Sequence, residues 1–150
     1  EISACLVGSE MCIRDSYVSM RVFELAYHGW DIHVSLDRNA VIRPQLQSFL
    51  VHLQLQMGKR SFEENEDLDG IYRFELQGSQ AWTTRIFNGK MEYGPIEPSP
   101  DAIIRTDANH FLLLATRRES ASLLQLDALL QIEGDRERAD QLLEAIGRGY

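Results

Sequence analysis

The chain has 150 residues, with 15 Lys and Arg against 23 Asp and Glu, so its formal net charge is −8. Proteins that bind a nucleic-acid backbone usually carry a basic patch, and this acidic composition therefore argues against a nucleic-acid partner. Since no apolar run approaches the roughly 20 residues that a bilayer-crossing helix needs, we expect no membrane span.

Residues 1–16, with the sequence EISACLVGSEMCIRDS, resemble translated sequencing-adapter sequence. We treat them as an artefactual leader and exclude them from fold reasoning, and we expect that natural upstream sequence has been lost. Both cysteines, Cys5 and Cys12, fall in this leader. The remainder therefore has no disulfide framework and no thiolate metal site, which fits the reducing cytoplasm, where we expect the protein to reside.

A polar triplet marks the first predicted helix, residues 18–37. Glu24, His28 and Asp31 are spaced by four and three residues, which places their side chains on one helical face. Two apolar stripes flank this face, namely Met20, Phe23, Tyr27, Trp30 and Val34 on one side and Leu25, Ile32 and Leu36 on the other. A carboxylate between apolar stripes is costly to bury without a cation or strong donors. The pattern indicates a metal site with Glu24 and His28 as ligands, or alternatively an ordinary surface pair.

Two ligands on one helix make only half of a zinc site, which usually has four ligands, three of them from protein when the site is catalytic. The other histidines are poorly placed to complete it. His33 points to the opposite side of the helix, and His52 and His110 lie in later elements. We therefore expect the missing ligand in sequence upstream of this chain.

A second helix is predicted over residues 46–57, with Gly58 as its C-cap. The acidic run at residues 63–67 is typical of a solvated linker, and we place the domain boundary near it. The predicted organisation is a leader at residues 1–16, a helical part at residues 17–58 and a C-terminal domain at residues 59–150.

Alternating apolar residues in the C-terminal domain predict strands at residues 72–76, 82–86, 90–94, 102–105 and 129–133. The dipeptide Asn88-Gly89 favours a type I′ turn, which would join the second and third strands as an antiparallel hairpin. We expect Trp82, Phe87 and Tyr93 in the core of the sheet rather than in a ligand cage.

Two helices accompany these strands. Asp107 is expected to cap the helix that carries Phe111 to Leu114, and Asp135 to cap the final helix, which ends near Ile146. The fold class is therefore α+β.

These landmarks resemble those of the mycothiol-dependent maleylpyruvate isomerase family. The Glu-x-x-x-His-x-x-Asp helix is similar to the last helix of that family's DinB-like metal-binding four-helix bundle. Residues 70–146 resemble its sterol-carrier-protein-like C-terminal domain, through Gly70-Ile-Tyr-Arg-Phe, Asn88-Gly89, Asp107 to Leu114, Leu114-Ala-Thr-Arg117 and Ile132-Glu-Gly-Asp135. The resemblance implies remnant helices of the bundle at residues 17–58, followed by an antiparallel-rich sheet covered by helices.

The same resemblance implies a divalent metal, zinc, held by Glu24 and His28 with a histidine from an earlier helix, and mycothiol or another small thiol as cofactor. A metal-bound thiolate could add reversibly to an activated double bond. Asp31 would orient His28 or contact the substrate, unless it is simply a polar helix residue. Arg117, followed by Arg118, would hold an anionic unsaturated acid, unless the arginines only cap carbonyls and face water.

Two functions from different classes follow. The first, which the polar triplet favours, is a fragment of a metal- and thiol-dependent isomerase or transferase, inactive in this truncated form. The alternative is a sterol-carrier-like module that binds lipid or another hydrophobic ligand. A large open apolar pocket between sheet and helices would favour the carrier, whereas large side chains filling that space would count against it.

Overall fold

The computed structural model describes residues 3–62 and 65–146, with side chains from residue 16 onward except at Glu66. Residues 1–2 and the side chains of the rest of the predicted leader up to Asp15 lie outside this described part. The chain divides into two compact units, a first unit up to Leu46 and a second unit from Gln47. The domain limits expected from the sequence, at residues 16 and 58, stay predictions.

The first unit consists of helix α1 (Ser3–Leu36), a turn and the start of helix α2 (Pro44–Ser61). Asp37 organises the turn, because its carboxylate accepts the Asn39 N–H at 2.9 Å and its carbonyl accepts the Ala40 N–H at 3.0 Å. The indole of Trp30 then donates to the Ala40 carbonyl at 2.8 Å, which ties the turn back onto α1. Pro44 opens α2, where a missing N–H costs nothing.

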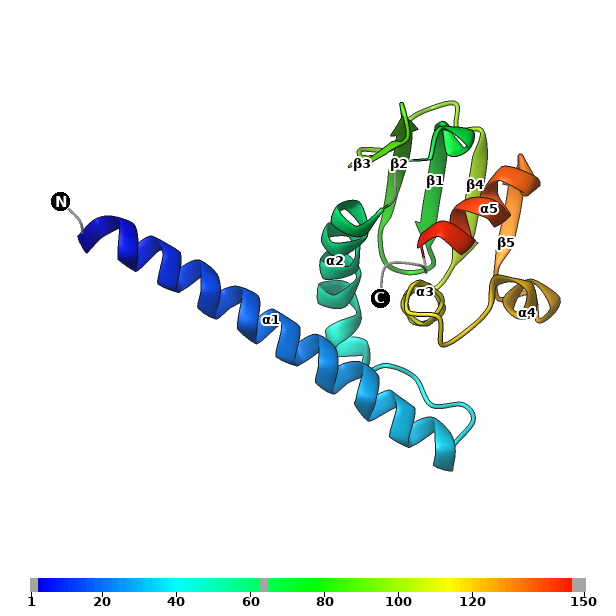
Figure 1. Ribbon diagram of the computed structural model, residues 1–150. Coiled ribbons are helices and arrows are strands. Elements are labelled where there is room, and N and C mark those ends of the chain that lie inside the picture. The colour runs from blue at the N-terminus through cyan, green and yellow to red at the C-terminus, as the bar shows by residue number, and fades with distance from the viewer. Residues whose placement is uncertain (1–2, 63–64, 147–150) are drawn as a thin grey trace. The chain divides into compact units, whose positions relative to one another are not determined.

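The second unit is built on one mixed sheet (Figure 1). Its strands in the described residues are β1 (Gly70–Leu76), β2 (Ala81–Phe87), β3 (Lys90–Gly94), β4 (Ala102–Thr106) and β5 (Gln131–Gly134), in the order β3-β2-β1-β4-β5. The pair β1–β4 is parallel, and the other pairs are antiparallel. Asp101 fixes the parallel register, since it exchanges two 2.7 Å hydrogen bonds with the backbone of Ile71.

The hairpin between β2 and β3 confirms the predicted turn. Asn88 and Gly89 have φ angles of 49° and 69°, the left-handed pair that a type I′ turn requires. The carboxylate of Asp69 accepts both of their N–H groups, at 2.8 and 2.9 Å. A short 3-10 helix, η1 (Glu66–Leu68), leads into this residue.

The helices of the second unit, beyond α2, are α3 (Ala108–Ala115), α4 (Ala121–Leu126) and α5 (Arg136–Ile146). Asp107 and Asp135 are the expected caps, because their carboxylates accept the N–H groups of His110 and Arg138. No helix was expected where α4 lies, and none of the helices in the described residues is long and apolar enough to cross a membrane.

Gly58 is not a C-cap, and that prediction is wrong. It lies buried inside α2, which continues to Ser61. A Cβ atom at this position would stand 3.1 Å from the hydroxyl of Tyr93 on β3, so the glycine makes room for β3 rather than ending the helix.

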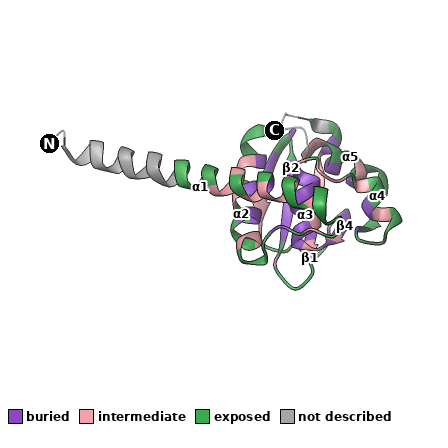
Figure 2. Ribbon diagram, turned by 90° about the horizontal axis from the view of Figure 1, so that it is seen from below, coloured by how far each residue is buried: buried purple, intermediate pink, exposed green. Residues whose placement is uncertain are grey.

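One face of the sheet carries the core, and Figure 2 shows buried residues concentrated on the strands and α3. The rings of Phe74 and Trp82 are stacked at 5.1 Å, and Phe111 of α3 meets both edge-on at 5.9 and 5.3 Å. Trp82 is therefore a core residue, as predicted. Phe87 is 67% exposed, because it belongs to the set of β2 residues that face away from the helices, and its predicted place in the core is wrong.

The opposite face of the sheet is charged. Arg105 lies between two carboxylates, with 2.7 Å contacts to Glu75 and to Glu133, and Arg85 contacts Glu97 at 2.6 Å. The hydrogen bonds to Glu133 and then to Glu75 raise the pKa of Arg105. Ion pairs of this kind suit a sheet face that stays in contact with water.

Candidate functional site

Glu24 lies at the surface of the first unit. Its carboxylate accepts a hydrogen bond from Arg21 at 2.7 Å, and the two side chains are 43% and 57% exposed. The second of the two apolar stripes that flank Glu24 is solvent-exposed, by 74% at Leu25, 64% at Ile32 and 86% at Leu36. The charge of Glu24 is thus satisfied by a guanidinium three residues earlier.

His28 and Asp31 are brought together. Nδ1 of His28 lies 3.3 Å from the Asp31 carboxylate, and the imidazole is 74% exposed. The described residues contain no group of three or more His, Cys, Asp or Glu side chains that could hold a metal ion. A catalytic zinc site usually has three protein ligands, and two are offered here. The roles of Glu24 and His28 as metal ligands, and of Asp31 as a catalytic residue, therefore stay predictions.

Arg117 follows the end of α3 in the second unit. Its φ angle is 56°, and the N–H groups of Arg117 and Arg118 donate to the carbonyls of Leu114 and Leu113 at 3.0 and 2.8 Å. The backbone of Arg117 therefore ends the helix in the left-handed geometry that usually selects glycine. Its role in holding a substrate stays a prediction.

The second unit holds a cleft of about 1430 Å³ beside α4. Its walls come from the end of α3, from α4, from β5 and from α5, and they include Leu114, Leu124, Leu130, Ile132 and Leu143. Arg117 also lines it. The rings of Phe74, Trp82 and Phe111 fill the space between the sheet and α3, so the open apolar pocket that would favour a carrier does not lie there.

The rim of this cleft is apolar on the side of α4. Leu123, Leu126 and Leu129 line the cleft and are 61%, 81% and 41% exposed. Burying one leucine side chain is worth about 1.5–3 kcal/mol, so three exposed leucines beside one hollow mark a surface suited to an apolar partner. The sequence feature that could have predicted α4 is Ser120, a typical N-cap residue, before a leucine-rich run. Its hydroxyl does cap the helix, because it accepts the Leu123 N–H at 3.3 Å.

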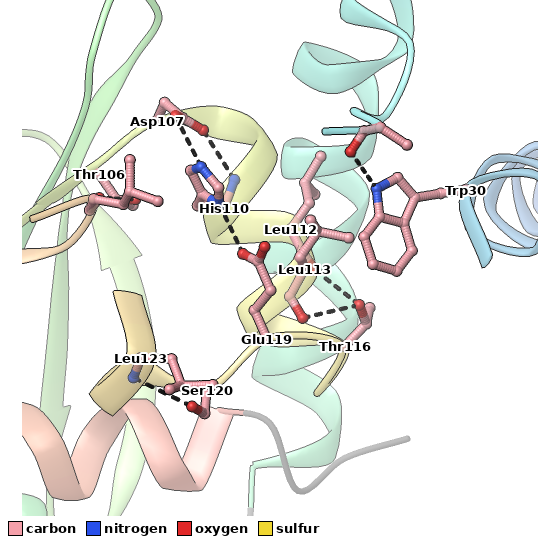
Figure 3. Close-up of polar contacts among 12 residues, drawn as sticks. Trp30, Thr106, Asp107, His110, Leu112, Leu113, Thr116, Glu119, Ser120 and Leu123 are labelled. Carbon is pink, nitrogen blue, oxygen red and sulfur yellow. Dashed lines mark hydrogen bonds and ion pairs between the residues drawn. The ribbon is translucent and has the colours of Figure 1, made fainter. Parts of the chain in front are cut away.

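Polar contacts hold α4 beside the cleft. Nδ1 of the His110 ring donates to the Glu119 carboxylate at 2.7 Å, while Nε2 lies 3.7 Å from the Asp107 carboxylate (Figure 3). At the other end of α4, the Gln125 amide donates to Asp140 of α5 at 2.8 Å. One polar contact thus lies just before this short helix and another near its C-terminal end.

The fold and the cleft define a small α+β module with room for a hydrophobic molecule, and the comparisons give its family. Residues 53–146 match the model of the SCP-2 sterol transfer family. The chain belongs to this family. A search of curated proteins found no match.

Solved structures agree on the fold. The sterol carrier protein domain 2 of Helicoverpa armigera is 14% identical with a TM-score of 0.56, and the match covers 73% of this chain and 95% of that one. Sterol carrier protein-2 of Aedes aegypti, in complex with palmitate, is 17% identical with a TM-score of 0.52. The match covers 67% of this chain and 94% of that one. A ubiquinone synthesis protein matches at 16% identity and a TM-score of 0.51, over 73% of this chain and 94% of its own. The chain spans only 13% and 14% of two sec-alkylsulfatase structures.

Proposed function

We propose that the second unit binds a hydrophobic small molecule in the cleft beside α4. The single observation that carries this proposal is the 1430 Å³ hollow rimmed by Leu123, Leu126 and Leu129. Ligand pockets in proteins commonly measure roughly 300–1,000 Å³, so the hollow has sufficient room. Membership of the SCP-2 sterol transfer family and the palmitate complex of the Aedes aegypti relative support the same class of ligand.

The comparisons favour this alternative over the isomerase that the polar triplet suggested. The ligand position differs from the expected one, because aromatic rings fill the space between the sheet and α3. A long acyl chain gains about 0.8 kcal/mol for each buried methylene, so even a cleft that covers part of a chain supports micromolar binding.

Titration of the full chain with a fluorescent fatty acid tests the proposal. We expect saturable binding that Leu123→Asp with Leu126→Asp weakens at least about tenfold, because two charges then line the apolar rim. Phe87→Asp is the matched control, since Phe87 is equally exposed but faces away from the helices, and it should leave the affinity unchanged. Absence of saturable binding to the unaltered chain would refute the proposal.

A second candidate function concerns α1. We propose that the polar triplet Glu24, His28 and Asp31 belongs to a zinc and mycothiol site of a maleylpyruvate isomerase-like enzyme acting on an anionic unsaturated acid. The observation that favours it is the exposed stripe of Leu25, Ile32 and Leu36 beside the triplet, which suits the apolar face of a further helix. Such a helix could supply the missing histidine ligand.

Metal analysis tests this second candidate. The 150-residue chain should retain little zinc, whereas protein carrying its upstream gene sequence should bind it near stoichiometrically. Glu24→Ala with His28→Ala should abolish that binding. Glu92→Ala with His52→Ala, which removes an exposed carboxylate and an exposed imidazole from separate elements, should not. Zinc retained by the first double variant would contradict the assignment.

A further inference from the structure

Helix α4 is joined to the rest of the second unit by two left-handed residues. Arg117 precedes it with a φ of 56°, and Ala128 follows it with a φ of 58°. Among the described residues other than glycine, the remaining positive φ is that of Asn88 in the hairpin turn. Residues other than glycine rarely adopt this left-handed conformation, which is typical of the residue that follows a helix C-cap. The chain therefore changes direction sharply on both sides of α4.

Few contacts hold α4 itself. Of its six residues, all described, only Leu124 is buried. Its other side-chain attachments are polar: the Gln125 amide donates to Asp140, the Gln125 carbonyl oxygen accepts from Arg136, and the Glu119 carboxylate just before the helix contacts His110. Segments with few buried apolar contacts open at a small fraction of the global free energy of unfolding.

The His110–Glu119 contact is partly protected from solvent. The two side chains are 18% and 26% exposed, and their 2.7 Å separation is that of a charge-assisted hydrogen bond. Nε2 of the same ring lies 3.7 Å from the carboxylate of Asp107, which also caps α3. The imidazole belongs to α3. Its contact with Glu119 therefore links α3 to the residue that directly precedes Ser120, the N-cap of α4 (Figure 3).

We propose that residues 117–128 form a lid, hereafter the α4 lid, which pivots at Arg117 and Ala128 and closes the apolar rim onto a hydrophobic ligand. The inference rests on the proposed binding function and adds the element that controls it. Closure would bury Leu123 and Leu126, which are otherwise exposed. His110 and Glu119 are positioning residues, because their contact sets the resting place of the lid without touching the ligand.

Amide hydrogen exchange of the full chain, followed by mass spectrometry without ligand, tests the lid. In the unaltered chain, the amides of residues 121–127 should exchange faster than those of β1. Glu119→Gln should speed that exchange about fivefold, because a neutral amide oxygen accepts a weaker hydrogen bond than a carboxylate does, while β1 and α5 keep their rates. Glu133→Gln is the matched control, since it removes a carboxylate paired with Arg105 on the sheet, and it should leave α4 unaffected.

Exchange in α4 as slow as in β1, or an equal response to Glu119→Gln and Glu133→Gln, would overturn the lid. If Glu119→Gln speeds exchange throughout the second unit, His110→Gln replaces it as the test variant. It should speed exchange in residues 121–127 while β1 keeps its rate, and any other result would overturn the lid. Added palmitate should slow exchange of residues 121–127 at least about threefold, and bound palmitate that leaves these rates unchanged would also overturn the lid. Failure of palmitate to bind refutes the proposed function instead, and the ligand-free comparison still decides whether the helix is mobile.

Discussion

Gly134→Ala is expected to destabilise the second unit strongly. Gly134 has a φ of 91° at the end of β5, opposite Ala102 of β4. A Cβ atom there would collide with the carbonyl oxygen of Asp101, a backbone atom that also accepts the Asp135 N–H at 2.9 Å. Left-handed geometry costs a side chain about 1–2 kcal/mol, and backbone displacement by an overlapping atom costs about 1–3 kcal/mol more. The free energy of unfolding should fall by about 3 kcal/mol.

Gly78→Ala is the matched control for this prediction. Gly78 has a φ of 68° in the turn between β1 and β2, but an added Cβ atom would meet nothing within 4 Å. Only the backbone strain remains, so the loss should be about 1 kcal/mol. Urea denaturation followed by circular dichroism measures both values, and melting temperatures should fall by about 4–8 °C for each kcal/mol. Equal losses for the two variants would show that the close approach to Asp101 contributes nothing.

Three further variants probe the helices of the second unit by the same measurement. Asp107→Ala should lower the free energy of unfolding by about 1 kcal/mol through loss of the α3 cap, and a loss as large in Asp107→Asn, which can still cap, would contradict this cause. Phe111→Ala should cost about 3–5 kcal/mol, because it removes the ring that meets Phe74 and Trp82, and a loss below 1 kcal/mol would mean that this cluster is not packed as described. Ala128→Gly should raise the free energy of unfolding by about 0.5–1 kcal/mol by relieving the left-handed residue after α4, and a decrease would argue against strain there.

Local patterns were sufficient for much of the second unit. The strands follow from alternating apolar residues, and Asn88-Gly89 determines its turn without help from distant residues. Capping by Asp107 and Asp135 is also local, because the acceptor and the donor lie within three residues of each other. These features could therefore be predicted from short stretches of sequence, as could the α+β class that they imply.

Features that depend on residues distant in the sequence could not be predicted. The buried place of Gly58 follows from the nearby hydroxyl of Tyr93, 35 positions further along the chain. Helix α4 has only six residues, too few for a helical period to stand out. The surroundings of Glu24 could not be predicted either, because its pairing with Arg21 and the exposure of Leu25, Ile32 and Leu36 depend on what packs against the helix.

The two edges of the sheet bear on how the protein resists aggregation. Strands β3 and β5 each have one side without a partner strand in the described sheet, and such edges can recruit strands from other molecules. β5 is only four residues long and carries Glu133, while β3 carries the exposed Lys90 and Glu92 and is followed directly by Pro95. Short length, charge and a nearby proline all disfavour the addition of a further strand. The sheet can thus keep a water-facing surface and two edges without offering a template for fibrils.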